Sequence, residues 1–163
     1  MLAWVDNRHH TNVVLQLALM LALAAPSLAD PALNPAVTQA TIAETICAPG
    51  YTYTVRPSWY ESAKLKLQLL TARGEAWISA PKYQLDHIIP LCLGGSPTDP
   101  SNLQLEPIDE AYRKDRVEIQ AMRCVCVGKV TLSEAQHDLA TDWCKSRSNT
   151  TSLKRLICSA APD

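Results

Sequence analysis

The sequence predicts one small α+β domain whose core is a strand–loop–strand–helix (ββα) unit. Its 163 residues suit a single domain and leave no room for a second one of full size. Residues 83–93 are apolar and β-branched, which favours a strand, and residues 102–105 are a second, very short strand before Pro107. Residues 109–126 then carry apolar side chains at helical spacing. These three segments predict the core, and further helices flank it.

Residues 1–29 are predicted to be a signal peptide rather than part of the fold. Val13–Ala25 is an uncharged apolar run that is too short to span a bilayer comfortably. Pro26 follows it, and Ser27-Leu28-Ala29 has the small-x-small pattern of a cleavage site. We expect cleavage after Ala29 and export of the protein to a periplasm or to the outside of the cell. An N-terminal membrane anchor or a buried core helix is the alternative interpretation.

The first part of the mature chain is predicted to hold a leader, a strand and a helix. Residues 30–40 contain prolines among small residues, which is typical of a flexible leader. The folded domain is expected over residues 41–145. Residues 51–55 alternate Tyr, Tyr and Val after the Pro49-Gly50 turn, which predicts a short strand. Residues 59–72 have helical spacing of apolar side chains and predict a helix.

The second part of the chain carries clear boundary signals. Gly94-Gly95 forces a turn after the first core strand. Asp109 is a good N-cap for the long helix of the core. Thr131 and Glu134 have the spacing of a capping box, so a last helix is expected to run through Trp143. Residues 146–163 form a C-terminal tail.

The cysteines indicate a disulfide framework. The mature part contains all six of them: Cys47, Cys92, Cys124, Cys126, Cys144 and Cys158. An even number in an exported chain of this size favours disulfides, although the pairing does not follow from sequence alone. Zinc is the rival interpretation. The Cys124-x-Cys126 pair has one intervening residue, which is the wrong spacing for a zinc ligand pair.

The charge of the chain excludes one class of nucleic-acid-binding protein. Its formal net charge is −1, so it is not a strongly basic protein that coats nucleic acid without specificity. Basic residues nevertheless gather in residues 113–129 and 145–155. They suffice for a local phosphate-binding surface, and a merely solvated face is the plainer interpretation.

Asp86 and His87 are the residues that point to chemistry. A carboxylate at the end of an apolar strand can hold a hard cation such as Mg²⁺ through an oxygen ligand. An adjacent imidazole titrates near neutral pH and can take a proton from water. The cation would then stabilise the charge that grows on a phosphoryl oxygen and on the leaving group.

Two later residues complete the candidate site. Asn102 does not titrate, and its amide can anchor the loop and orient the imidazole. Lys114, early in the long helix, is a candidate phosphate contact, and an ion-paired or solvated lysine is the alternative. Each residue alone is a weak signal, but together they describe a ββα layout with a metal cleft between two strands and a helix.

This stretch resembles the bacterial HNH endonuclease family, which has the ββα-metal fold. Residues 83–107 (YQLDHIIPLCLGGSPTDPSNLQLEP) resemble that family's DH-hydrophobic-P-x-x-x-GG…N-L core. Residues 111–118 (AYRKDRVE) resemble its KD-x-x-E helix start. Residues 126–143 (CVGKVTLSEAQHDLATDW) resemble the C-x-G…L-x-EAQ…DW segment that follows. Residues 45–57 (TICAPGYTYTVRP) look like the N-terminal strand of exported members.

The resemblance implies an exported bacterial endonuclease, periplasmic or extracellular, that hydrolyses phosphodiester bonds of DNA or RNA. It implies His87 as general base, Asp86 as metal ligand and Asn102 as the middle, structural residue. The implied cofactor is a divalent cation, with Mg²⁺ expected and Mn²⁺, Ni²⁺ or Zn²⁺ as alternatives. The same resemblance suggests a disulfide from Cys47 to Cys124 or Cys126.

The sequence departs from the family at the third HNH position, in the first turn of the helix. Family members have His or Asn there, whereas this chain offers Glu110, Ala111 and Tyr112. Of the three, Glu110 is the candidate metal ligand because hard cations accept carboxylates. The departure keeps an alternative open: a catalytically inactive HNH-fold module that binds or has a structural role in the bacterial envelope. A hydrolase of another phosphate ester is a further alternative.

Overall fold

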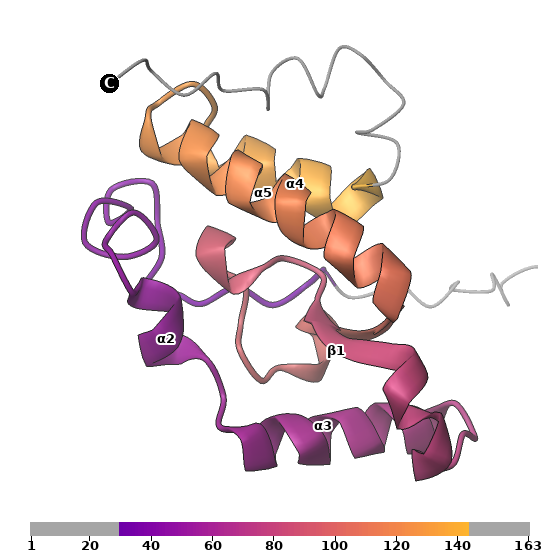
Figure 1. Cartoon of the computed structure of the whole chain (residues 1–163). Helices are drawn as coiled ribbons and strands as arrows, with labels where there is room; N and C mark the ends of the chain where they lie inside the picture. Colours follow the sequence, from indigo (N-terminus) through magenta and orange to yellow (C-terminus); the bar gives the residue numbers. More distant parts are fainter. Residues whose placement is uncertain (1–29, 144–163) are drawn as a thin grey trace, which may run out of the picture.

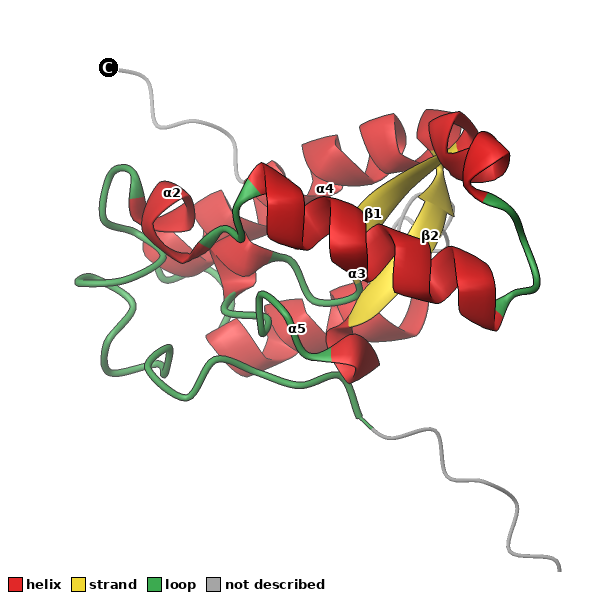
Figure 2. Ribbon diagram, turned by 90° about the horizontal axis from the view of Figure 1, so that it is seen from below, coloured by secondary structure: helices red, strands yellow, loops and turns green. Residues whose placement is uncertain are grey.

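The computed structural model describes residues 30–143 and confirms the α+β class. A small antiparallel sheet of two strands, β1 (Tyr83–His87) and β2 (Leu103–Pro107), lies between helix α3 (Trp59–Ala72) and helix α4 (Ile108–Cys126). Figure 1 shows α4 and the last helix above the sheet and α3 below it, and Figure 2 shows the strands between α3 and α4 from a second side. The sheet is therefore covered on both faces by helices.

The two strands meet in a register that defines the site. Asp86 pairs with Gln104 and His87 pairs with Leu103, at the end of β1 where the chain leaves the sheet. The chain between the strands contains two short 3-10 turns, η2 (Leu91–Leu93) and η3 (Pro100–Asn102). The first strand was predicted over residues 83–93 but ends at His87. Pro90 has no N–H to donate to a neighbouring strand, so the apolar run continues as a turn rather than as a strand.

The helices of the second half lie close to their predicted bounds. Helix α4 begins at Ile108 with Pro107 in the N-cap position, so the predicted N-cap Asp109 lies inside the first turn. Helix α5 (Leu132–Asp142) starts with the predicted capping box, in which the Thr131 hydroxyl accepts from the N–H of Glu134. Helix α3 has a second capping box, formed by Ser58 and Glu61.

The segment predicted as a strand at residues 51–55 is instead a short helix, α2 (Tyr51–Val55). A strand needs a partner, and no strand of the described chain pairs with this segment. Its backbone is satisfied locally, since the N–H of Arg56 donates to the carbonyl of Thr52 (3.1 Å). Gly50 precedes it with a φ of 81°, a left-handed conformation that suits glycine. The alternation of the tyrosines therefore wrongly predicted a strand with one buried face, because Tyr53 is exposed.

Residues 30–40, predicted as a flexible leader, pack against the Gly94-Gly95 turn. The N–H of Asn34 donates to the carbonyl of Gly94 (2.8 Å), and Leu33 forms a bridge with Gly95. The side chain of Val37 is buried in the main core. This one apolar side chain anchors a segment whose prolines and small residues suggested only a linker.

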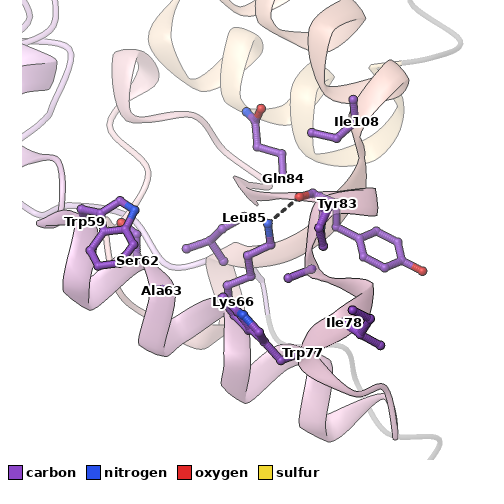
Figure 3. Close-up of a pocket in the computed structure, with 12 residues that line it drawn as sticks. Trp59, Ser62, Ala63, Lys66, Trp77, Ile78, Tyr83, Gln84, Leu85 and Ile108 are labelled. Atoms are coloured by element: carbon purple, nitrogen blue, oxygen red, sulfur yellow. Dashed lines mark hydrogen bonds between the residues drawn. The ribbon is translucent and has the colours of Figure 1, made fainter.

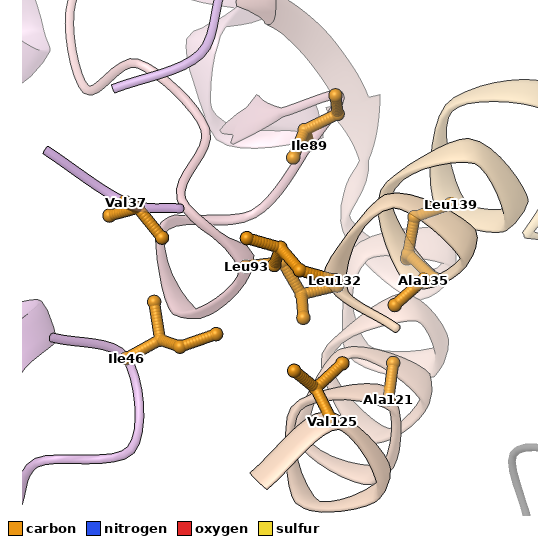
Figure 4. Close-up of a cluster of buried hydrophobic side chains, with 9 residues drawn as sticks. All are labelled: Val37, Ile46, Ile89, Leu93, Ala121, Val125, Leu132, Ala135 and Leu139. Carbon is orange, nitrogen blue, oxygen red and sulfur yellow. The ribbon is translucent and has the colours of Figure 1, made fainter. Parts of the chain in front are cut away.

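The main core joins this N-terminal segment to the two last helices (Figure 4). Its buried members come from the N-terminal segment, the chain after β1, α4 and α5: Val37, Ile46, Ile89, Leu93, Ala121, Val125, Leu132, Ala135 and Leu139. A smaller cluster of Leu70, Ala80 and Leu105 lies between α3 and β2. Since Ile89 and Leu93 belong to the main core, this core anchors the loop that follows β1.

A disulfide joins Cys47 to Cys126, so the predicted link from the N-terminal segment to the end of the long helix is confirmed. Cys124 is also disulfide-bonded, whereas Cys92 is a free thiol. The predicted signal peptide, the C-terminal tail, Cys144 and Cys158 lie outside the described residues. Within residues 30–143, we find no helix with the length and apolar character to cross a membrane.

Candidate functional site

Asp86 lies in the middle of a buried polar network on the α4 side of the sheet. The residue is 6% exposed, and its carboxylate accepts from the ammonium of Lys114 (2.6 Å). Gln104 pairs with Asp86 on the neighbouring strand β2, and its amide nitrogen lies 3.5 Å from the same oxygen, Oδ2. Gln104 also donates to the carboxylate of Glu106 (2.6 Å), whose side chain is buried too. Burial and the neighbouring Asp86 raise the pKa of Glu106.

Lys114 is the most deeply buried charged group of the described chain, with 1% of its surface exposed. Its Nζ donates to Asp86 Oδ2 (2.6 Å), to Glu118 Oε1 (2.8 Å) and to the carbonyl of His87 (2.6 Å). Three oxygen acceptors satisfy the three N–H donors of an ammonium. Burial lowers the pKa of Lys114, but the carboxylates of Glu118 and Asp86 outweigh this and raise it above its usual value.

This burial bears on the expected role of Lys114. A phosphate contact needs an exposed ammonium, and this one is enclosed by protein oxygens on α4 and β1. In the structure Lys114 is the ion-paired lysine that stood as the alternative. It links the end of β1 to α4 and holds both the carboxylate of Asp86 and the backbone of His87.

Asn102 is fully buried and clamps the loop that follows β1. Its Oδ1 accepts from the N–H of Ile89 (2.8 Å), while its Nδ2 donates to the carbonyls of Ile89 (3.0 Å) and Ser96 (2.9 Å). Gly95 passes so close that a Cβ there would lie 1.8 Å from the Ile89 carbonyl oxygen and 2.6 Å from Asn102 Nδ2. Only glycine fits this position, so the Gly-Gly turn and Asn102 together shape the loop beside His87.

The His87 ring is held by one hydrogen bond to the same loop. Its Nε2 lies 3.1 Å from the carbonyl oxygen of Pro97, and a carbonyl only accepts, so Nε2 carries the proton. In the neutral ring the lone pair is then on Nδ1. Burial, the largest effect, lowers the pKa of His87 below its ordinary value of 6.5. The ring is therefore neutral at pH 7, in the form that can accept a proton.

His87 and Asp86 border a cavity of about 340 Å³ between β1, α2 and α4. Three carboxylates line it, from Asp86, Asp115 and Glu118, and apart from His87 the basic side chain on its wall is that of Arg56 at the end of α2. Burial raises the pKa of Glu118 to about 7. The cavity is thus acidic, and an incoming phosphate would need a cation there.

Glu110 does not join the other predicted site residues. Its carboxylate pairs with Arg113 on the same helix (2.9 Å), and Arg113 also pairs with Asp109 (3.3 Å). Within residues 30–143, no group of three or more His, Cys, Asp or Glu side chains is arranged to hold a metal ion. The structure thus brings together Asp86, His87 and Lys114, with Asn102 behind them. The role of Glu110 stays a prediction.

Sequence reasoning assigned no role to Arg56 or Glu118, which the structure adds to the site. The sequence did contain a signal that Glu118 belongs to the site. It is the glutamate of the Lys-Asp-x-x-Glu segment and lies one helical turn after Lys114. The sequence contains no such signal for Arg56, since this residue follows a segment that was interpreted as a strand. Its place on the cavity wall depends on how α2 packs.

Comparisons with protein-family models, with curated proteins and with solved structures find no match to this chain.

Proposed function

We propose that this protein is an exported endonuclease of the HNH, ββα-metal type that hydrolyses phosphodiester bonds of nucleic acid, with His87 as general base. The main support for the proposal is the environment of the His87 ring: its hydrogen bond, its protonation and its position at the cavity. Its Nε2 is fixed by Pro97, its neutral form is favoured by burial, and it borders an open cavity beside Asp86. The order β1, β2, α4 along the chain agrees with the motif resemblance of residues 83–118.

In the proposed reaction, Nδ1 of His87 takes a proton from a water molecule that attacks phosphorus. A new oxygen–phosphorus bond forms, the bond to the leaving ester oxygen breaks, and that oxygen is protonated from solvent. The Pro97 carbonyl stabilises the imidazolium that results, because it accepts from Nε2 throughout the step. Asn102 keeps Pro97 in place, since it clamps the loop on both sides of Gly95.

A divalent cation, Mg²⁺ or alternatively Mn²⁺, Ni²⁺ or Zn²⁺, suits the donors of this cavity. Both hydrogen bonds to Asp86 go to Oδ2, which leaves Oδ1 to ligate a cation. Mg²⁺ in nuclease-like sites uses one or two carboxylates together with waters and substrate phosphate, so a ready-made cluster of three ligands is not required. Such a cation would supply charge stabilisation at the phosphoryl oxygen and the leaving group.

Arg56 is the residue we propose for phosphate contact in place of Lys114. It is exposed, and it lines the same cavity as Asp86 and His87. A guanidinium presents a planar pair of N–H donors that matches a phosphate. It also offsets the negative charge of Asp115 and Glu118, which would otherwise repel a nucleic-acid backbone.

Export is proposed from the predicted signal peptide and agrees with the disulfides. Disulfides persist in oxidising compartments outside the cytosol. The Cys47–Cys126 bond and the bonded state of Cys124 are those expected of a periplasmic or extracellular protein.

One observation favours the alternative of an inactive binding or structural module. The carboxylate of Asp86 is already neutralised by Lys114, and Glu110 is engaged by Arg113. Under this alternative the protein keeps the ββα fold but does not catalyse phosphodiester hydrolysis.

The deciding experiment incubates the purified protein with plasmid DNA and with RNA in the presence of Mg²⁺, Mn²⁺, Ni²⁺ or Zn²⁺, each with a chelator control. The proposal predicts cleavage of at least one substrate that the chelator abolishes. Intact substrates under every condition would favour the inactive module.

A further inference from the structure

A second hollow, of about 580 Å³, lies between α3, the 3-10 turn η1 (Trp77–Lys82) and β1 (Figure 3). Its lining is mainly apolar and includes Trp59 at the start of α3, Trp77 and Ile78 on η1, and Lys66. We call this hollow the tryptophan groove. Neither the HNH motif nor the mechanism above uses any of these side chains.

Two features of the tryptophan groove point to a ligand with flat rings. Trp59 is 83% exposed and Trp77 is 51% exposed, although both are large aromatic residues that normally bury much of their surface. Lys66, which starts beside Trp77, donates from Nζ to the carbonyl of Tyr83 (2.6 Å), and this holds its cationic end in the wall of the groove (Figure 3). Exposed indole rings with a neighbouring cation are the chemistry that binds unpaired bases.

The groove and the cavity of the candidate site share part of their lining. Gln84 and Leu85 on β1 line both hollows, and Asp86 and His87 follow them directly on the same strand. A strand rises about 3.3 Å per residue, so Leu85 at the edge of the groove lies roughly 7 Å along β1 from His87. That distance is within reach of the nucleotides next to a phosphodiester held at His87.

The charge around the groove also suits a polyanion. Residues 56–82 contain five basic residues and two acidic ones, whereas the chain as a whole has a formal net charge of −1. Lys64 and Lys82, on α3 and at the end of η1, are exposed near the lining residues. A backbone of phosphates can follow these cations while its bases lie against the indole rings.

From these observations we propose that the tryptophan groove binds unpaired bases of a single-stranded nucleic acid on one side of the cleaved bond. The inference rests on the proposed function, because it takes the cavity at His87 as the place of the scissile phosphodiester. It makes single-stranded DNA or RNA, or an unpaired region of a duplex, the preferred substrate over intact duplex.

The test measures binding by fluorescence anisotropy with a labelled 12-nucleotide oligothymidylate and with a labelled 12-base-pair duplex. All proteins carry His87→Ala so that the probes stay intact. The Trp59→Ala/Trp77→Ala double variant is compared with a Tyr112→Ala control, which removes an exposed aromatic residue that lines neither hollow. A Trp59→Phe/Trp77→Phe variant keeps a ring for stacking.

We expect the double alanine variant to bind the oligothymidylate at least about tenfold more weakly, since loss of one stacked ring alone costs roughly 5- to 150-fold. The phenylalanine variant and the Tyr112→Ala control should bind almost as the parent does, and duplex binding should change little. Equal single-strand affinity in all variants would overturn the proposal, and so would an equal loss for duplex and single strand.

The two proposals fail separately. Suppose that the protein with His87 intact does not cleave nucleic acid, while the double variant loses single-strand binding. The groove proposal is then supported and the nuclease proposal is wrong. If the protein cleaves nucleic acid and the indole rings make no difference to single-strand binding, the groove proposal falls and the nuclease stands.

Discussion

The ammonium of Lys114 lies 2.6 Å from Oδ2 of Asp86, and the two residues join helix α4 to the end of strand β1 across 28 positions of sequence. The pair is almost fully enclosed, and Glu118 and the His87 carbonyl complete the coordination of the ammonium. One buried cation thus sets the position of both residues that we assign to chemistry. The Lys114–Asp86 ion pair therefore belongs both to the packing of α4 on the sheet and to the candidate site.

Lys114→Met should strongly destabilise the protein. The change leaves the carboxylates of Asp86 and Glu118 facing each other without their shared cation, and loss of one partner from a buried pair costs about 3–5 kcal/mol. Urea unfolding followed by circular dichroism measures this. Lys64→Met, on the exposed side of α3, is the matched control and should stay within about 0.5 kcal/mol of the parent. Equal midpoints for the two variants would show that the pair does not hold the fold.

Arg56→Ala should weaken substrate binding without loss of stability. A charge-assisted hydrogen bond contributes about 1.5–3 kcal/mol, so we expect KM to rise by roughly 10- to 100-fold while the melting temperature stays unchanged. Arg116→Ala is the control, because this exposed arginine on α4 does not line the cavity. A parallel rise of KM in both variants would indicate general electrostatic attraction and remove Arg56 from the site.

The Cys47–Cys126 disulfide should contribute a large share of the stability. It closes a loop with a sequence separation of 79 residues. In the chain-entropy model a loop of this size stabilises the fold by about 4 kcal/mol. The Cys47→Ser/Cys126→Ser double variant should therefore unfold at a much lower urea concentration. Cys92→Ser, at the free thiol, serves as the control. A double variant as stable as the parent would contradict the estimate.

The pH dependence of cleavage should follow the neutral form of His87. Burial lowers its pKa, so the ring loses its proton below the ordinary value of 6.5. The rate should therefore be at its plateau at pH 7 and decline only as pH falls through a midpoint below 6.5. The same sign applies to stability: the contribution of the neutral ring is present above pH 6.5 and is lost as pH falls through the folded-state pKa. A kcat profile with its acid midpoint above 6.5 would exclude His87 as a buried general base.

The sequence allowed the order of the core elements to be predicted because each one has a local signal. The Thr131–Glu134 capping box and the helical spacing before Gly128 depend on neighbours in the chain, and both were confirmed. The link from Cys47 to the end of α4 was also predicted correctly. Local chemistry was sufficient for the helix boundaries, whereas the link from Cys47 was predicted from the family resemblance.

Other features depend on tertiary contacts and were missed. Tyr51 and Tyr53 alternate as in a strand, but no strand of the described chain lies beside them, so the segment became the helix α2. Val37 lies among prolines and small residues in the predicted leader, and only the fold shows that it is buried.

The burial of Lys114 could have been predicted. Lys114 precedes Val117 by three residues and Ala121 by seven, which places it on the apolar face of α4. A lysine on such a face needs buried acceptors, and Glu118 one turn later is the nearest carboxylate in sequence. The place of Arg56 could not be predicted, because it depends on how α2 packs against the cavity.

The role of His87 as general base is tested by the cleavage rate of the His87→Ala variant on the substrate that the parent protein cleaves best. We expect a loss of about 10²–10⁴ in rate, the size typical of one general base, with an unchanged melting temperature. His137→Ala is the matched control, since this exposed histidine of α5 lies away from the cavity, and it should cleave at the parent rate. A His87→Ala variant that cleaves as fast as the His137→Ala control would contradict the assignment of His87 as general base.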